Sequence, residues 1–122
     1  MLLVVTLVGG SSTPSVAKPR TPYQVSLYAS RATVAAGQEI VFTGKVRPHG
    51  PQARLGKVKL QVVYDPAIGF ETSGLDKPDR YGNYVVSWSA STPGTYQVRA
   101  RIAAGRNHSE GISRVLTVTV TA

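Results

Sequence analysis

Residues 93–102 read Pro93-Gly94-Thr95-Tyr96-Gln97-Val98-Arg99-Ala100-Arg101-Ile102, and this stretch decides the fold. A Pro-Gly turn comes first, and apolar residues then alternate with polar ones. Successive side chains of a β-strand point to opposite faces. The even-numbered residues from 96 to 102 should therefore face a core, while Gln97, Arg99 and Arg101 face water. The pattern predicts a half-buried strand over residues 95–103.

The same alternation recurs from residue 23 onward, with turn-forming residues between the segments. It predicts strands over residues 23–29, 39–47, 57–64, 83–90 and 112–121, and a short edge strand over 70–75. Gly82 should supply a positive φ angle in the turn before residues 83–90. Each segment has one apolar face, so two sheets must stack to bury these faces. About seven strands in one domain predict an all-β, immunoglobulin-like antiparallel β-sandwich.

Composition restricts the possible functions. Hydrophobic residues make up 42% of the 122 positions, which is typical of one folded domain and too apolar for a disordered chain. The chain has no Cys, which excludes disulfides, thiolate metal sites and a Cys nucleophile. Lys and Arg outnumber acidic residues 14 to 6, and the net charge of +8 favours contact with anionic polymers or surfaces. Alternatively, this charge serves only solubility.

The N-terminal segment resembles an export signal in most respects. Residues 1–17 carry no charge, residues 2–8 are apolar, and Ser15-Val16-Ala17 places small residues before a cleavage site. This pattern predicts a signal peptide over residues 1–17, although no Lys or Arg precedes the apolar run; a disordered tail is the alternative. Residues 18–22 are then a linker and residues 23–122 the domain, and the protein is expected to be secreted or on the cell surface.

Several landmarks along the domain resemble those of bacterial immunoglobulin-like (Ig-like) domains. They lie at residues 36–48, 80–84, 93–100 and 115–120, and together they span residues 23–121. The resemblance implies an exported, non-catalytic spacer or adhesive module. Tyr96 corresponds to a Tyr that antibody domains have on the same strand. Antibody domains have a Cys two residues after that Tyr, whereas this chain has Val98. Recognition through antibody-type loops is therefore not expected.

Two aromatic residues are expected to be structural. Trp88 is in phase with Tyr84 and Val86, which predicts that its indole is buried in the core. Tyr96 follows the Pro-Gly turn and is predicted to form a tyrosine corner, in which the hydroxyl bonds back to the preceding connection.

The sequence offers little for catalysis or metal binding. The two histidines, His49 and His108, lie in separate loops. Asp76, Asp79 and Asn83 could supply oxygen ligands to Ca²⁺, but their spacing is not that of an EF-hand and a simple turn is favoured. No catalytic triad or phosphate-binding loop is visible. We therefore predict no enzyme activity, no cofactor and no metal.

The basic residues indicate a candidate binding face. Lys57 and Lys59 alternate with apolar residues, as Arg99 and Arg101 do, so all four should point outward. Immunoglobulin topology makes their two strands neighbours, and the four cations would then share one sheet face. The face lacks aromatic residues for stacking bases, which argues against specific nucleic-acid binding. It would suit teichoic acid or another cell-envelope polyanion, or it is simply a solvated face.

Two functions therefore remain open from the sequence. The first is a non-catalytic exported module that acts as a structural spacer or binds an unknown protein. The alternative is an electrostatic binder of anionic envelope polymers or polysaccharides through Lys57, Lys59, Arg99 and Arg101.

Overall fold

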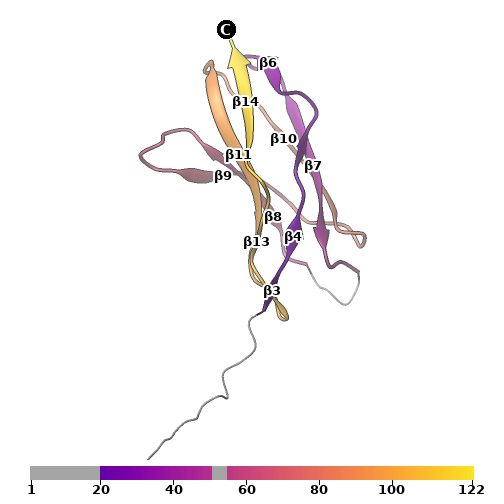
Figure 1. The fold of residues 1–122 in the computed structure, drawn as a ribbon. Helices are drawn as coiled ribbons and strands as arrows, with labels where there is room; N and C mark the ends of the chain where they lie inside the picture. Colours follow the sequence, from indigo (N-terminus) through magenta and orange to yellow (C-terminus); the bar gives the residue numbers. More distant parts are fainter. Residues whose placement is uncertain (1–19, 51–54) are drawn as a thin grey trace, which may run out of the picture.

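The computed structural model describes residues 20–50 and 55–122, and all regular structure in them is β-strand (Figure 1). Two main sheets lie face to face with the core between them, which confirms the predicted all-β, immunoglobulin-like sandwich. The expected leader over residues 1–17 lies outside the described residues. Residues 20–50 and 55–122 contain no helix that is long and apolar enough to cross a membrane.

The first sheet has the order β10-β7-β4, with β5 also paired to β7. Its strands are β4 (Gln24–Val25), β5 (Tyr28–Ala29), β7 (Ile40–Arg47) and β10 (Asn83–Trp88). All of its pairs are antiparallel. Residues 24–29 follow one register along β7, so the predicted strand over residues 23–29 is divided without any slip.

A serine hydroxyl that replaces a backbone carbonyl as hydrogen-bond acceptor explains why β4 and β5 are separate strands. The Ser26 hydroxyl accepts the N–H of Lys45 at 2.9 Å, in place of the Ser26 carbonyl. That carbonyl instead accepts a hydrogen bond from the Tyr84 hydroxyl. Tyr84 reaches it by passing over Gly44, where any β-carbon would overlap both the hydroxyl and the carbonyl.

The second sheet has the order β6-β14-β11-β8-β9, with β13 also paired to β11. Its strands are β6 (Thr33–Ala35), β8 (Val58–Val63), β9 (Phe70–Asp76), β11 (Gly94–Ile102), β13 (Gly111–Ile112) and β14 (Leu116–Thr121). The expected edge strand is β9, which turns away from β11 and β14 in Figure 1. A register shift between Leu60 and Gln61 leaves Ser73 as an additional residue in β9, and such bulges bend a strand.

Two features of the second sheet were not expected from the sequence. β6 pairs with β14 in parallel, so the chain crosses from the first sheet to the second just before β6. The predicted strand over residues 112–121 is divided into β13 and β14, because its register on β11 shifts by one residue between Ile112 and Leu116. At the break, the Ser113 hydroxyl accepts the N–H of Ala100 at 2.8 Å. A third, small sheet pairs β3 (Thr21–Pro22) in parallel with β12 (His108–Ser109).

An aromatic cluster joins the two sheets at one end of the core. Trp88 on β10 is 5% exposed and lies edge-on to Phe42 and to Tyr96, with ring centres 6.3 and 5.3 Å away. Its indole N–H donates to the Tyr64 hydroxyl at 2.8 Å. The Tyr96 hydroxyl donates to the carbonyl of Thr92, four residues upstream, which is the geometry of a tyrosine corner.

The tyrosine corner should contribute measurably to stability. Tyr96→Phe keeps the ring in contact with Trp88 and removes only the bond to Thr92. We expect a loss of about 0.5–1.5 kcal/mol in the free energy of unfolding, measured by urea denaturation. An unchanged unfolding midpoint would show that the hydroxyl makes no net contribution.

The passage of Tyr84 over Gly44 gives a second test with a matched control. Gly44→Ala places a methyl group where the Tyr84 hydroxyl and the Ser26 carbonyl already meet. We expect a loss of about 1–3 kcal/mol or more, as for other overpacked sites. Gly56→Ala is the control, because a β-carbon at Gly56 meets nothing within 4 Å. Equal unfolding midpoints for the two variants would contradict this account of Gly44.

Candidate functional site

The register of the second sheet brings the four predicted cations together on its outer face. Arg101 pairs with Lys59 across β11 and β8, and Arg99 pairs with Gln61 one step further along. Lys57 directly precedes β8 and is exposed. The intervening apolar residues are buried in the core, so the cations lie on the opposite side of both strands. Gln61 lies on the same outer side as Lys59 but is only 8% exposed. We refer to Lys57, Lys59, Arg99 and Arg101 as the basic face.

Two members of the basic face are held by neighbours that are distant in the sequence. The Arg99 Nε donates to the Gln61 side-chain oxygen at 2.9 Å, and the guanidinium carbon lies 4.0 Å from the centre of the Phe70 ring. Arg101 forms an ion pair with Glu110. No local signal marks these partners, because each comes from a different part of the chain. The Phe70 ring also corrects the expectation that the face lacks aromatic residues, because pairing of β9 with β8 brings it to Arg99.

The two lysines of the basic face are less constrained. Within residues 20–50 and 55–122, the ion pair of Arg101 with Glu110 is the only one. Lys59 therefore faces Arg101 without a carboxylate of its own in that part of the chain. Only one of the four cations has a carboxylate partner among the described residues, so the face keeps a net positive charge. Lys59 and Arg101, directly opposite on neighbouring strands, also repel each other.

A groove opens at one end of the same outer face, beside the turn between β8 and β9. It has a volume of about 530 Å³ and lies between that turn and the start of β11. We call it the hairpin groove, and it is lined by Val63, Tyr64, Pro66, Gly69, Phe70, Thr95 and Gln97. In the sheet register, Val63 on β8 lies between Phe70 on β9 and Gln97 on β11. Gln97 is two residues from Arg99 along β11, so the groove lies next to Arg99 on the same face.

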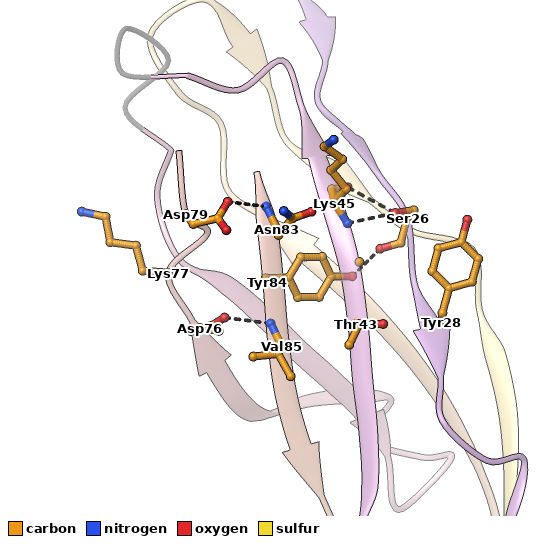
Figure 2. Close-up of a pocket in the computed structure, with 11 residues that line it drawn as sticks. Ser26, Tyr28, Thr43, Lys45, Asp76, Lys77, Asp79, Asn83, Tyr84 and Val85 are labelled. Atoms are coloured by element: carbon orange, nitrogen blue, oxygen red, sulfur yellow. Dashed lines mark hydrogen bonds between the residues drawn. The ribbon is translucent and has the colours of Figure 1, made fainter. Parts of the chain in front are cut away.

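A second depression, of about 600 Å³, lies on the first sheet (Figure 2). Tyr28 and Val85 line it and are both more than half exposed. The Tyr84 side chain crosses it toward Ser26. Burial raises the pKa of the Tyr84 phenol well above its usual range, so the hydroxyl stays protonated and acts as a donor.

The carboxylates at the edge of this depression already have backbone partners. Asp76 accepts the N–H of Val85 at 2.8 Å, which caps a free backbone donor on edge strand β10. Asp79 accepts the N–H groups of Tyr81 and Asn83 at 2.8 and 3.0 Å. These bonds support the simple turn over the Ca²⁺ alternative. Across the described residues, no group of three or more His, Cys, Asp or Glu side chains is placed to hold a metal ion.

Glycine and histidine complete this turn. Gly82 has a φ of 82°, in the left-handed region that favours glycine, and its carbonyl accepts the N–H of Val46 at 2.9 Å. A β-carbon at Gly82 would overlap the Val46 carbonyl and touch the His49 side chain. The other histidine, His108, stacks on the Tyr23 ring with centres 4.9 Å apart.

Comparison with known proteins shows a likeness of fold. No family model and no curated protein matches the sequence. Among solved structures, a superoxide reductase (neelaredoxin) from Ignicoccus hospitalis has a TM-score of 0.55 at 10% identity, with 84% of this chain and 82% of that chain covered. The PKD domain of human KIAA0319 has a TM-score of 0.53 at 17% identity, with 92% of each chain covered.

A CARDB domain from Pyrococcus furiosus is also similar, with a TM-score of 0.48 at 15% identity over 85% of this chain and 98% of that chain. At such identities the likeness to the reductase and the PKD domain concerns the fold alone. The chain therefore shares the Ig-like sandwich architecture of the PKD domain, and a shared fold does not by itself imply a shared function.

The Asp79 turn should make stability depend on pH in the acidic range. The backbone N–H of Asn83, more than that of Tyr81, holds the pKa of Asp79 below its ordinary value of 3.8. The ionised carboxylate therefore stabilises the fold above pH 3.8, and this contribution disappears as pH falls through the lowered pKa. Asp79→Asn should reduce the decline in melting temperature below pH 4, whereas Glu39→Gln should not. Parallel declines in all three proteins would contradict the role of Asp79.

Proposed function

We propose that this chain is a non-catalytic Ig-like module of the bacterial type, exported from the cell, which binds anionic envelope polymers through its basic face. One observation carries the binding: Lys59 and Arg101 lie directly opposite each other on neighbouring strands. Two like charges in this position destabilise a sheet. A polyanion laid across β8 and β11 would contact both cations and relieve their repulsion.

The surroundings of the cations support this proposal. Gln61 and Phe70 fix the Arg99 side chain against the sheet, so its guanidinium loses less conformational freedom on binding. Glu110 pairs with Arg101 and so reduces its repulsion from Lys59 in part, whereas the other three cations have no carboxylate partner among the described residues. The net charge of +8 adds a long-range attraction that would steer a polyanion toward the protein.

Export and the absence of catalysis rest on different observations. The uncharged, apolar character of residues 1–17 supports export. The non-catalytic assignment is supported by Asp76 and Asp79, whose carboxylates are engaged with backbone N–H groups. The two histidines have separate surroundings, one beside Gly82 and the other against Tyr23.

Charge reversal tests the binding role of the basic face. Four substitutions to Glu, at Lys57, Lys59, Arg99 and Arg101, reduce the net charge from +8 to zero. We expect this variant to lose binding to teichoic acid and to heparin in titration calorimetry. Binding by the parent protein should weaken steeply with added salt, because salt screens charges beyond about 8 Å at physiological ionic strength.

The matched control carries the same change in net charge elsewhere on the surface. Its four reversals fall on exposed cations outside the basic face, namely Arg31, Arg47, Lys77 and Arg80. This control should bind nearly as well as the parent protein. Equal losses in the two variants would mean that only net charge matters. No binding by the parent protein to either polymer would favour a structural spacer.

A further inference from the structure

Resting on the proposed function, we infer that the polymer is an acidic polysaccharide that carries carboxylates, and that the hairpin groove holds one of its sugar rings. The inference comes from the juxtaposition of this groove with Arg99. Electrostatic attraction alone would require only the cations. The groove adds a second kind of contact beside them, and that contact restricts the chemistry of the ligand.

The two sides of the hairpin groove differ in polarity. Val63, Pro66 and Phe70 supply an apolar side from β8, β9 and the turn between them. Thr95 and Gln97 on β11 supply the opposite side, and both residues are exposed. Neither of these two polar side chains has a hydrogen-bond partner within residues 20–50 and 55–122. Binding pockets commonly combine an apolar lining with a few polar groups that fix orientation.

A sugar ring matches this division of the groove. One face of a pyranose presents C–H groups, which suit Val63 and Phe70, and its edge presents hydroxyls, which suit Gln97 and Thr95. The volume of about 530 Å³ falls within the range of small-ligand pockets, so the groove is large enough for a sugar residue.

Arg99 explains why the sugar should be acidic. Its guanidinium lies over Phe70 at the border of the groove, and its Nε is held by Gln61. The two Nη groups have no hydrogen-bond partner in the described part of the chain. A planar guanidinium pairs with a carboxylate through two parallel hydrogen bonds. A uronic acid in the groove could place its carboxylate on Arg99 while its ring stays on the apolar side.

The basic face continues the site along the strand. Arg101 and Lys59 lie two residues beyond Arg99 and Gln61, which is about 7 Å along a strand. Further acidic sugars of the same chain would meet these cations in turn. The groove therefore selects one sugar ring, and the remaining cations add affinity along the polymer.

Other polyanions fit this surface less completely. A phosphate polymer would use the cations but would gain little from Val63 and Phe70. An acidic peptide would offer carboxylates to Arg99 but no ring of hydroxyls to Gln97 and Thr95. These polymers are therefore suitable comparison ligands.

The experiment compares three probes of matched charge in titration calorimetry: an oligogalacturonate, polyglutamate and polyphosphate. We expect the tightest binding for the oligogalacturonate at physiological salt. Phe70→Ala should weaken oligogalacturonate binding roughly tenfold, since a buried aromatic contact is lost. Gln97→Ala should weaken it roughly three- to tenfold through the loss of hydrogen bonds. Gln97→Ala should leave polyglutamate binding unchanged. Phe70→Ala also removes the ring that holds Arg99, so it should weaken polyglutamate binding too, but by a smaller factor than oligogalacturonate binding.

Two controls separate binding from folding. Gln97 is exposed, so Gln97→Ala should keep the melting temperature of the parent protein even if Phe70→Ala lowers it. Tyr28→Ala removes an exposed aromatic ring from the opposite sheet and should leave all three affinities unchanged. Equal affinities for the three probes, together with unchanged binding by Gln97→Ala, would overturn the sugar site but leave the basic face as a polyanion site. No binding of any probe would overturn the proposed function as well.

Discussion

The contact on which the rest of the structure depends is that of Trp88 with the opposite sheet. Its indole N–H reaches the Tyr64 hydroxyl, and its ring packs edge-on against Tyr96. Tyr64 in turn bonds at 2.8 Å to the hydroxyl of Ser73, the additional residue in the β9 bulge. One buried side chain of the first sheet thus fixes the end of β8, the start of β11 and the bend of β9. Phe70 lies in the part of β9 before this bulge, where it pairs with Val63 and lines the hairpin groove.

Two serines show how this sandwich accommodates interruptions in its ladders. At Ser26 and at Ser113, a hydroxyl accepts a backbone N–H in place of a carbonyl. Buried backbone groups need partners, so the strands can break at these points without leaving a donor unsatisfied. At Ser26 the released carbonyl accepts the Tyr84 hydroxyl, and only glycine at position 44 leaves room for that contact.

Charge is distributed unevenly over the two outer faces. At the edge of the first sheet, Asp76 from the end of β9 and Asp79 from the turn after it accept backbone N–H groups, and so stabilise edge strand β10 and the turn. On the second sheet, cations are concentrated on β8 and β11, and only Arg101 has an acidic partner among the described residues. The first arrangement serves the fold. The second leaves positive charge beside an open groove, which is the arrangement expected of a surface that binds an acidic ligand.

The sequence by itself determined the class of fold, the approximate strands and the outward direction of the four cations, because alternation along a strand is a local property. The burial of Trp88 and the turn at Gly82 follow from equally local patterns. Only the tertiary structure decided the parallel pairing of β6, the broken strands and the partners of Arg99. Those features depend on register between distant segments and on side chains that replace backbone acceptors. No local pattern indicates which residues of two distant strands lie opposite each other. The contact of Phe70 with Arg99 and the hairpin groove therefore follow only from the register of β8, β9 and β11.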